Sequence, residues 1–104
     1  MISPQRGEIW IVDLGPVAKT RPAMVVSIPL LDEDRALVTI VPHTTSTRQT
    51  QYEVSVAARF LKPGAFEIQN IQTIPLAKFV RRLGMLSDGD FERIETTLRQ
   101  WLGL

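Results

Sequence analysis

The chain has 104 residues and no cysteine, which excludes disulfide bonds, cysteine zinc sites and a thiol nucleophile. Hydrophobic residues make up 44% and charged residues 22% of the chain, a balance typical of a folded domain and not of a disordered segment. The formal net charge of +1 is too small to indicate nucleic-acid binding by itself. No apolar stretch approaches the roughly 18 residues needed to cross a bilayer, so we expect one cytoplasmic domain over residues 1–104.

The first half of the chain predicts three strands. Residues Glu8–Leu14 are rich in β-branched and aromatic types and predict the first strand, followed by a loop over Asp13–Thr20. A nearly continuous apolar run predicts a second, buried strand at Arg21–Ile28. After a charged turn at Asp32–Arg35, a third apolar strand is expected at Ala36–Val41.

The second half predicts shorter strands separated by polar segments. Residues Thr44–Thr50 predict a polar loop, and the alternation over Tyr52–Val56 predicts a half-exposed strand. A turn at Lys62–Gly64 precedes a strand over Ala65–Ile74, which we expect to bend midway because its alternation slips there. The last strand is expected at Phe79–Leu86.

The end of the chain predicts one helix. Ser87 has the properties of a helix N-cap, with Asp90 three residues later and acids in the first turn. An apolar stripe follows at helical spacing, formed by Phe91, Ile94, Leu98, Trp101 and Leu102. Several short strands followed by one helix predict a mainly β fold, specifically a small antiparallel SH3-like barrel with a C-terminal α-helix.

The residue types present restrict the chemistry that the chain can support. One histidine, no cysteine and no clustered carboxylates argue against a metal hydrolase, so we expect neither a metal nor a cofactor. No Gly-rich phosphate loop and no G-x-S-x-G motif is present. Arginines and hydroxyls suit charge stabilisation on a phosphate, and RNA supplies its own nucleophile, the 2′-hydroxyl. A metal-free ribonuclease is therefore among the few enzymes that this inventory fits.

Five residues are candidates for that chemistry. Arg21 is held extended by the proline after it and could stabilise a phosphorane-like transition state, although a surface arginine at a strand end is the simpler alternative. Thr44, Thr45 and Ser46 could donate hydrogen bonds to a phosphate oxygen or could satisfy a turn. His43 could be a general base or a structural histidine. A nuclease requires that position 21 and residues 44–46 share one cleft.

Further polar residues are candidates for RNA binding. Contacts to backbone phosphates or to base edges are expected from Lys19, Arg48, Gln69, Arg81 and Arg82, each of which could also be an ordinary solvated surface residue. The aromatic side chains are expected mainly in the core and not as base-stacking platforms. These are Trp10, Phe60, Phe66 and Phe79, with Trp101 in the core or at an interface.

Taken together, these segments resemble the MazF/PemK toxin family over essentially the whole chain. The first pair, R-G-E-I-W followed by R-P-A-x-V-V-S, is the most specific part of the resemblance. The matching segments are Arg6–Leu14, Thr20–Ser27, Ile40–Ser46, Ile68–Pro75 and Arg82–Leu86, followed by a helix that ends in W-L-G-L.

This resemblance implies the SH3-like barrel of the CcdB/PemK type, a homodimer, and metal-independent cleavage of single-stranded RNA that leaves a cyclic phosphate. It also implies a cognate antitoxin that covers the RNA groove. The family's catalytic arginine falls on Arg21 and its catalytic threonine on Thr45, or on Thr44 if the register shifts by one. Ser46 follows in the same loop. The family's first loop is usually longer and acidic, whereas Gly15–Thr20 carries only Lys19 as a charge.

Three functional hypotheses follow. The first is a toxin that is a sequence-specific endoribonuclease acting on mRNA, in which His43 could supply the base that the first loop lacks. The second is a toxin of the CcdB type that binds DNA gyrase through its C-terminal helix, for which Arg21 would be dispensable. The third is an inactive, RNA-binding relative. Both toxin hypotheses predict an acidic antitoxin, encoded alongside, that folds on contact.

Overall fold

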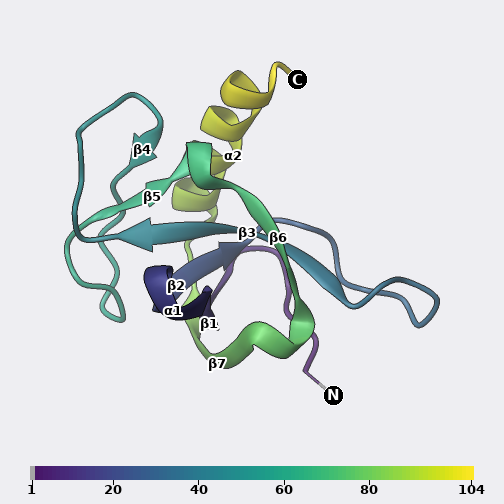
Figure 1. Cartoon of the computed structure of the whole chain (residues 1–104). Coiled ribbons are helices and arrows are strands. Elements are labelled where there is room, and N and C mark those ends of the chain that lie inside the picture. Colours follow the sequence, from purple (N-terminus) through teal and green to yellow (C-terminus); the bar gives the residue numbers. More distant parts are fainter. Residues whose placement is uncertain (1) are drawn as a thin grey trace.

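Seven antiparallel strands and a C-terminal helix dominate this computed structural model, which describes residues 2–104 (Figure 1). The strands are β1 (Glu8–Asp13), β2 (Thr20–Val25), β3 (Leu37–Thr44), β4 (Glu53–Val54), β5 (Ala65–Glu67), β6 (Gln72–Pro75) and β7 (Phe79–Met85). The helices are α1 (Gly15–Ala18) and α2 (Asp88–Leu102), and two 3₁₀ turns are η1 (Ile68–Asn70) and η2 (Leu76–Lys78).

Strand β3 organises the sheet. The hydrogen-bonded order is β4-β5-β3-β2-β1-β7, and β6 pairs with the first half of β3, while β5 pairs with its end. The sheet bends strongly around this strand, and α2 runs past β4 and β5 on one side (Figure 1). The expected mainly β, barrel-like architecture with a C-terminal helix is confirmed.

Both faces of the central strands are buried, which explains their continuous apolar sequence. One cluster, which contains Ile9, Met24 and Phe66, packs against α2 through Ile94 and Leu98. A second cluster occupies the other face and contains Trp10, Val12, Ala23, Val25, Val38, Ile40, Ile74 and Phe79. Neighbouring residues such as Ile9 and Trp10 belong to different clusters because successive side chains of a strand point to opposite faces.

The aromatic side chains divide between core and surface. Trp10, Phe66 and Phe79 are buried, as expected. The core position expected for Phe60 is only partly observed, because its ring is half-buried at the edge of a cleft. Trp101 does not lie in the core of this chain: it is 41% exposed and packs its ring against Tyr52, at 5.2 Å between centroids.

Several element boundaries differ from the expectations. The loop expected over Asp13–Thr20 contains the short helix α1, in whose first turn Pro16 supplies the required φ. Strand β2 ends at Val25. Beyond it, the side chain of Ser27 takes the place of a backbone partner, because its Oγ accepts a hydrogen bond from the backbone N–H of Thr39 at 3.0 Å. Strand β3 continues past Val41 to Thr44, so the expected polar loop begins one residue later.

The break and the cap near the end of the chain were predicted correctly. The expected bend in Ala65–Ile74 is the turn η1, which separates β5 from β6. Helix α2 begins after Ser87, whose Oγ accepts from the backbone N–H of Asp90 at 3.2 Å. It ends at Gly103, whose φ of 72° forms a left-handed C-cap.

Candidate active site

A cleft of about 430 Å³ lies where β1, β2, β3 and β7 meet the loop between β4 and β5. It is lined by Ile11, Thr20, Arg21, Pro22, His43, Thr44, Thr45, Ser46, Phe60, Lys62, Arg81 and Leu83. Antiparallel pairing creates it by placing the start of β2 beside the end of β3. Ala23 pairs with Pro42, and from this pair β2 runs back to Arg21 while β3 runs on to Thr44. The cleft required of a nuclease, shared by position 21 and residues 44–46, is therefore present.

Arg21 is held at the cleft by two hydrogen bonds. Its Nε donates to the carbonyl oxygen of Ala18 in α1 at 3.2 Å, and its Nη1 donates to Glu67 Oε1 on β5 at 3.1 Å. The two side chains of the ion pair are about one-third exposed, at 35% and 30%. A guanidinium has five N–H donors, so these two contacts fix its plane and leave donors for a phosphate.

The three hydroxyl residues after β3 have different environments. Thr44 is buried, and its Oγ1 accepts from the backbone N–H of Ser46 at 3.0 Å. This is a local turn of the kind that threonine forms with the second following residue. Thr45 and Ser46 are exposed on the cleft side of that turn. The Thr44 hydroxyl is thus partly used by the backbone, whereas Thr45 presents its hydroxyl at the surface.

His43 is a buried imidazole at the base of the cleft. It is 3% exposed, and its ring lies edge-on to Phe66 at 5.1 Å between centroids. Its Nε2 has no hydrogen-bond partner within residues 2–104. Burial lowers the pKa of His43 from its ordinary value of 6.5, because desolvation disfavours the imidazolium. The ring is therefore neutral at pH 7.

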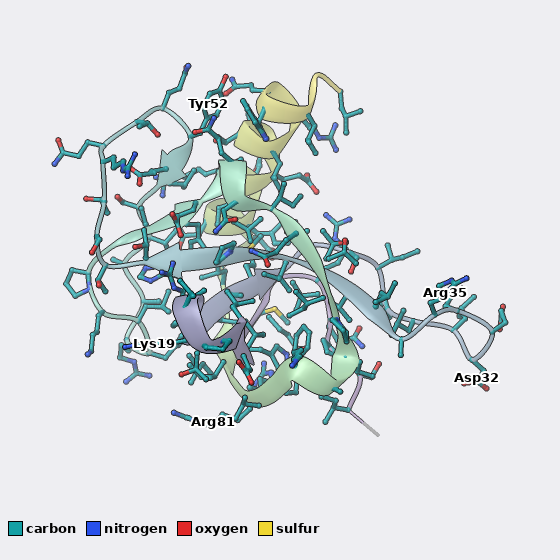
Figure 2. All side chains as sticks on the ribbon, in the orientation of Figure 1. Lys19, Asp32, Arg35, Tyr52 and Arg81 are labelled. Carbon is teal, nitrogen blue, oxygen red and sulfur yellow. The ribbon has the colours of Figure 1, made fainter. Side chains whose placement is uncertain are left out.

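The structure brings together only some of the residues proposed as site residues. Arg21, His43, Thr44, Thr45, Ser46 and Arg81 line the cleft, whereas Lys19, Arg48, Gln69 and Arg82 do not. Figure 2 shows Lys19 and Arg81 on the same side of the molecule, and Arg35 on the projecting loop between β2 and β3.

Arg82 is engaged elsewhere. Arg81 and Arg82 are adjacent on β7, so their side chains point to opposite faces. The Arg82 Nε donates to Glu8 Oε2 at 2.6 Å. Burial by itself raises the pKa of Glu8, but hydrogen bonds from Gln5, Trp10 and Arg82 reverse this and lower the pKa overall. Arg82 therefore stabilises a buried carboxylate on β1.

Among the residues at or beside the cleft that the sequence does not predict as site residues, Phe60, Lys62 and Glu67 matter most. Phe60 was assigned to the core and Lys62 to a turn, but both line the cleft. Glu67 supplies a carboxylate beside Arg21 from a strand 46 residues away in sequence. A basic and aromatic run, R-F-L-K at residues 59–62, was the available signal for the first two. No local signal linked Glu67 to Arg21.

The polar groups of the cleft are cations, hydroxyls and one imidazole. Within the described part of the chain, no three His, Asp or Glu side chains gather in a way that could hold a metal ion. None of the helices in residues 2–104 combines the length and the apolar character needed to cross a membrane. The arrangement fits an anionic ligand, since positive groups surround surface hydroxyls.

The chain is similar to proteins of one toxin family. The profile of PemK-like, MazF-like toxins of type II toxin–antitoxin systems matches residues 5–102. Among solved structures, the chain is similar to an endoribonuclease in complex with its cognate antitoxin from a mycobacterial species, at 28% identity over 97% of this chain and 96% of that chain, with a TM-score of 0.83. The Mycobacterium tuberculosis toxin MazF-mt6 is 26% identical over 93% and 97% of the two chains, with a TM-score of 0.79. MazF from Deinococcus radiodurans shares the fold over both whole chains, with a TM-score of 0.87 at 18% identity.

Proposed function

Because residues 5–102 match its profile, the chain belongs to the PemK-like, MazF-like toxin family of type II toxin–antitoxin systems, and we propose that it is a metal-independent endoribonuclease that cleaves single-stranded RNA in the cytoplasm. The endoribonuclease from a mycobacterial species, 28% identical, supports this activity. The observation that carries the proposal is the cleft in which Arg21 faces the hydroxyl turn 44–46. The family match favours this function over a CcdB-like gyrase poison.

The proposed reaction is an internal transfer within RNA. The 2′-oxygen attacks the adjacent phosphorus, a new O2′–P bond forms, and the P–O5′ bond breaks. The 2′-hydroxyl loses its proton to a base, and the leaving 5′-oxygen gains one. The products are a 2′,3′-cyclic phosphate and a 5′-hydroxyl. The added negative charge on the non-bridging oxygens is what the site must stabilise.

The cleft residues divide these tasks. Arg21 stabilises the developing charge and does not act as the proton donor, because a guanidinium is not deprotonated in proteins. Thr45 donates a hydrogen bond to a non-bridging oxygen, and its exposure beside Arg21 supports it over Thr44, whose hydroxyl already bonds Ser46. His43, neutral at pH 7, accepts the 2′-hydroxyl proton. Ser46 adds a second hydroxyl at the rim.

Glu67 and Arg81 complete the proposed site. Glu67 fixes the guanidinium plane of Arg21 through the contact between Nη1 and Oε1 at 3.1 Å. It thereby supplies, from β5, the carboxylate that the loop Gly15–Thr20 lacks. Arg81 is exposed at the cleft and binds a backbone phosphate.

Two protein partners belong to this proposal. The first is a cognate antitoxin, as in the complex of the mycobacterial endoribonuclease, and an acidic segment would complement the cations of the cleft. The second is another copy of the chain. Trp101, Leu102 and Leu104 leave exposed apolar surface at the end of α2, which suits an isologous dimer contact.

The test is digestion of a mixed-sequence RNA by the purified protein in the presence of a metal chelator. Discrete fragments with cyclic phosphate ends are expected from the wild type, and about 100- to 1,000-fold slower cleavage from Arg21→Ala. The matched control is Arg35→Ala, which removes the same charge from the projecting loop (Figure 2) and should cleave normally. Salt-dependent RNA binding without cleavage would instead indicate an inactive relative.

A further inference from the structure

A second hollow lies directly beside the cleft. It is a groove of about 930 Å³, lined by Ser55, Val56, Ala57, Ala58, Arg59, Leu61, Lys62, Pro63, Gly64, Asp90 and Arg93. The segment 59–62 forms the wall between the two hollows: Phe60 borders the cleft, Arg59 and Leu61 border the groove, and Lys62 borders both. A chain that leaves the cleft over Lys62 therefore enters the groove.

The groove is positively charged. Arg59, Lys62 and Arg93 line it, with Asp90 as the acid among its lining residues. Asp90 is paired with Arg93 at 3.4 Å, so those two charges largely cancel. Arg59 and Lys62 are exposed, and neither forms an ion pair with another group of residues 2–104. Two unpaired cations thus extend the charge of the cleft into the groove.

The wall between the hollows is anchored by Phe60. Its ring rests on the backbone of β7 at Gly84, where an added Cβ would lie 2.5 Å from the ring. This close approach requires glycine and fixes the segment on the sheet. The half-buried ring also borders the cleft, which Lys62 lines as well. An aromatic ring next to cations is the combination by which proteins bind single-stranded nucleic acid.

We propose that single-stranded RNA continues from the cleavage cleft, where Phe60 stacks on a base, across Lys62 into this groove, where Arg59 and Lys62 bind phosphates of nucleotides beyond the cleaved bond. This extended subsite rests on the proposed nuclease function. It adds affinity for RNA and has no part in the bond-forming and bond-breaking steps. Arg59 is the diagnostic residue because it lines only the groove, whereas Lys62 lines both hollows.

The test compares two RNAs that carry a 2′-deoxy nucleotide at the cleavage site, so that binding is measured without cleavage. One is long enough to pass well beyond the cleft on both sides, and the other has only the nucleotides that flank the cleaved bond. Fluorescence anisotropy gives Kd for each RNA at several salt concentrations. Arg59→Ala should weaken binding of the long RNA about tenfold. It should also reduce the slope of log Kd against log salt by about 0.7, the value for one phosphate on a single strand. The short RNA should bind the wild type and Arg59→Ala equally well.

The other variants sharpen this comparison. Lys62→Ala should weaken binding of both RNAs. Phe60→Leu should also weaken binding of both RNAs, with no change in the slope of log Kd against log salt. Arg35→Ala, the matched control on the projecting loop, should leave the Kd of both RNAs unchanged. Thermal melting of each variant identifies loss of folding.

The proposal is overturned if Arg59→Ala leaves the Kd and salt slope of the long RNA unchanged while the wild type still cleaves. The nuclease function would then hold without the extended subsite. It is also overturned if Arg59→Ala weakens the long and the short RNA equally, or weakens only antitoxin binding, since the groove would then be a protein site. If the wild type cleaves no RNA but the long RNA still depends on Arg59, the subsite is supported and the nuclease fails.

Discussion

The Arg21 guanidinium donates from Nη1 to Glu67 Oε1 at 3.1 Å, from β2 to β5 across the end of β3. The intervening strand carries His43 and Thr44 and leads into the exposed hydroxyl of Thr45. One ion pair therefore spans the strand that presents the other proposed catalytic groups. An RNA phosphate that binds Arg21 must do so beside a carboxylate, which weakens ground-state binding but holds the guanidinium plane for the transition state.

Substitution of Glu67 should separate binding from chemistry. Glu67→Ala is expected to slow the cleavage step at saturating RNA about tenfold or more, because Arg21 loses its restraint. Affinity for a non-cleavable RNA should stay the same or increase, since a negative charge near the phosphate is removed. Single-turnover rates and Kd values measure the two effects. A parallel loss of affinity and rate would contradict the positioning role, and Glu67→Gln should recover part of the rate because it keeps an acceptor.

The threonine pair distinguishes a catalytic hydroxyl from a structural one. Thr45→Val should reduce the cleavage rate about 100-fold with little change in melting temperature, because its hydroxyl is exposed. Thr44→Val should cost about 1 kcal/mol of folding stability, since the Ser46 N–H loses its acceptor. Cleavage assays and denaturant unfolding on both variants give the comparison. The assignment of Thr45 is wrong if the larger rate loss belongs to Thr44→Val.

His43 should make stability and activity pH-dependent. Burial lowers its pKa in the folded protein, so the unfolded chain binds a proton more readily below pH 6.5. Stability is therefore full above that pH and falls as the pH decreases toward the lower folded pKa. The His43→Asn variant should lose less stability than wild type between pH 7 and pH 5, as measured by thermal melting.

The same substitution tests the proposed base. His43→Asn should slow cleavage at pH 7.5 about 100-fold and should remove the decline of the wild-type rate at acid pH. A variant with the wild-type pH–rate profile would show that another group accepts the proton and that His43 is structural.

Gly64 fixes the distance between β5 and the end of β3. A Cβ at this position would lie 2.1 Å from the carbonyl oxygen of Thr44 and 2.8 Å from His43 Cε1. Because the first contact is with backbone, Gly64→Ala should force the strands apart at the cleft, destabilise the fold by about 1–3 kcal/mol and reduce cleavage. Gly89→Ala, which meets nothing within 4 Å on α2, is the matched control. Equal unfolding midpoints for the two variants would contradict this account.

The predictable parts of the fold were those with local signals. Ser87 and the apolar stripe after it define α2 without reference to the rest of the chain. The end of β3 was missed because Pro42 lacks the N–H that a strand usually donates. The structure continues the strand because one edge of β3 changes partners, from β6 over residues 37–40 to β5 at His43 and Thr44, while β2 still pairs with Pro42 on the other edge. Partner exchange of this kind has no signature in the sequence.

The same distinction applies to the site. Arg21 and the hydroxyl turn could be proposed because the first begins a recognisable strand, the second follows one, and both resemble family segments. Arg81 and Arg82 looked equivalent, and only the register of β7 on β1 decides which one reaches the cleft. Glu67 could not be proposed, because its link to Arg21 exists only once β5 has paired with β3.

The central claim is that Arg21 promotes attack by the 2′-hydroxyl of RNA. The most direct measurement is the single-turnover cleavage rate, in chelator, of two RNAs that differ by one 2′-oxygen at the cleavage site, with wild type and Arg21→Ala. We expect rapid cleavage of the all-ribose RNA by the wild type, no cleavage of the 2′-deoxy RNA, and a rate about 100- to 1,000-fold lower for Arg21→Ala. Cleavage of the 2′-deoxy RNA, or equal rates for the two proteins, would contradict the mechanism.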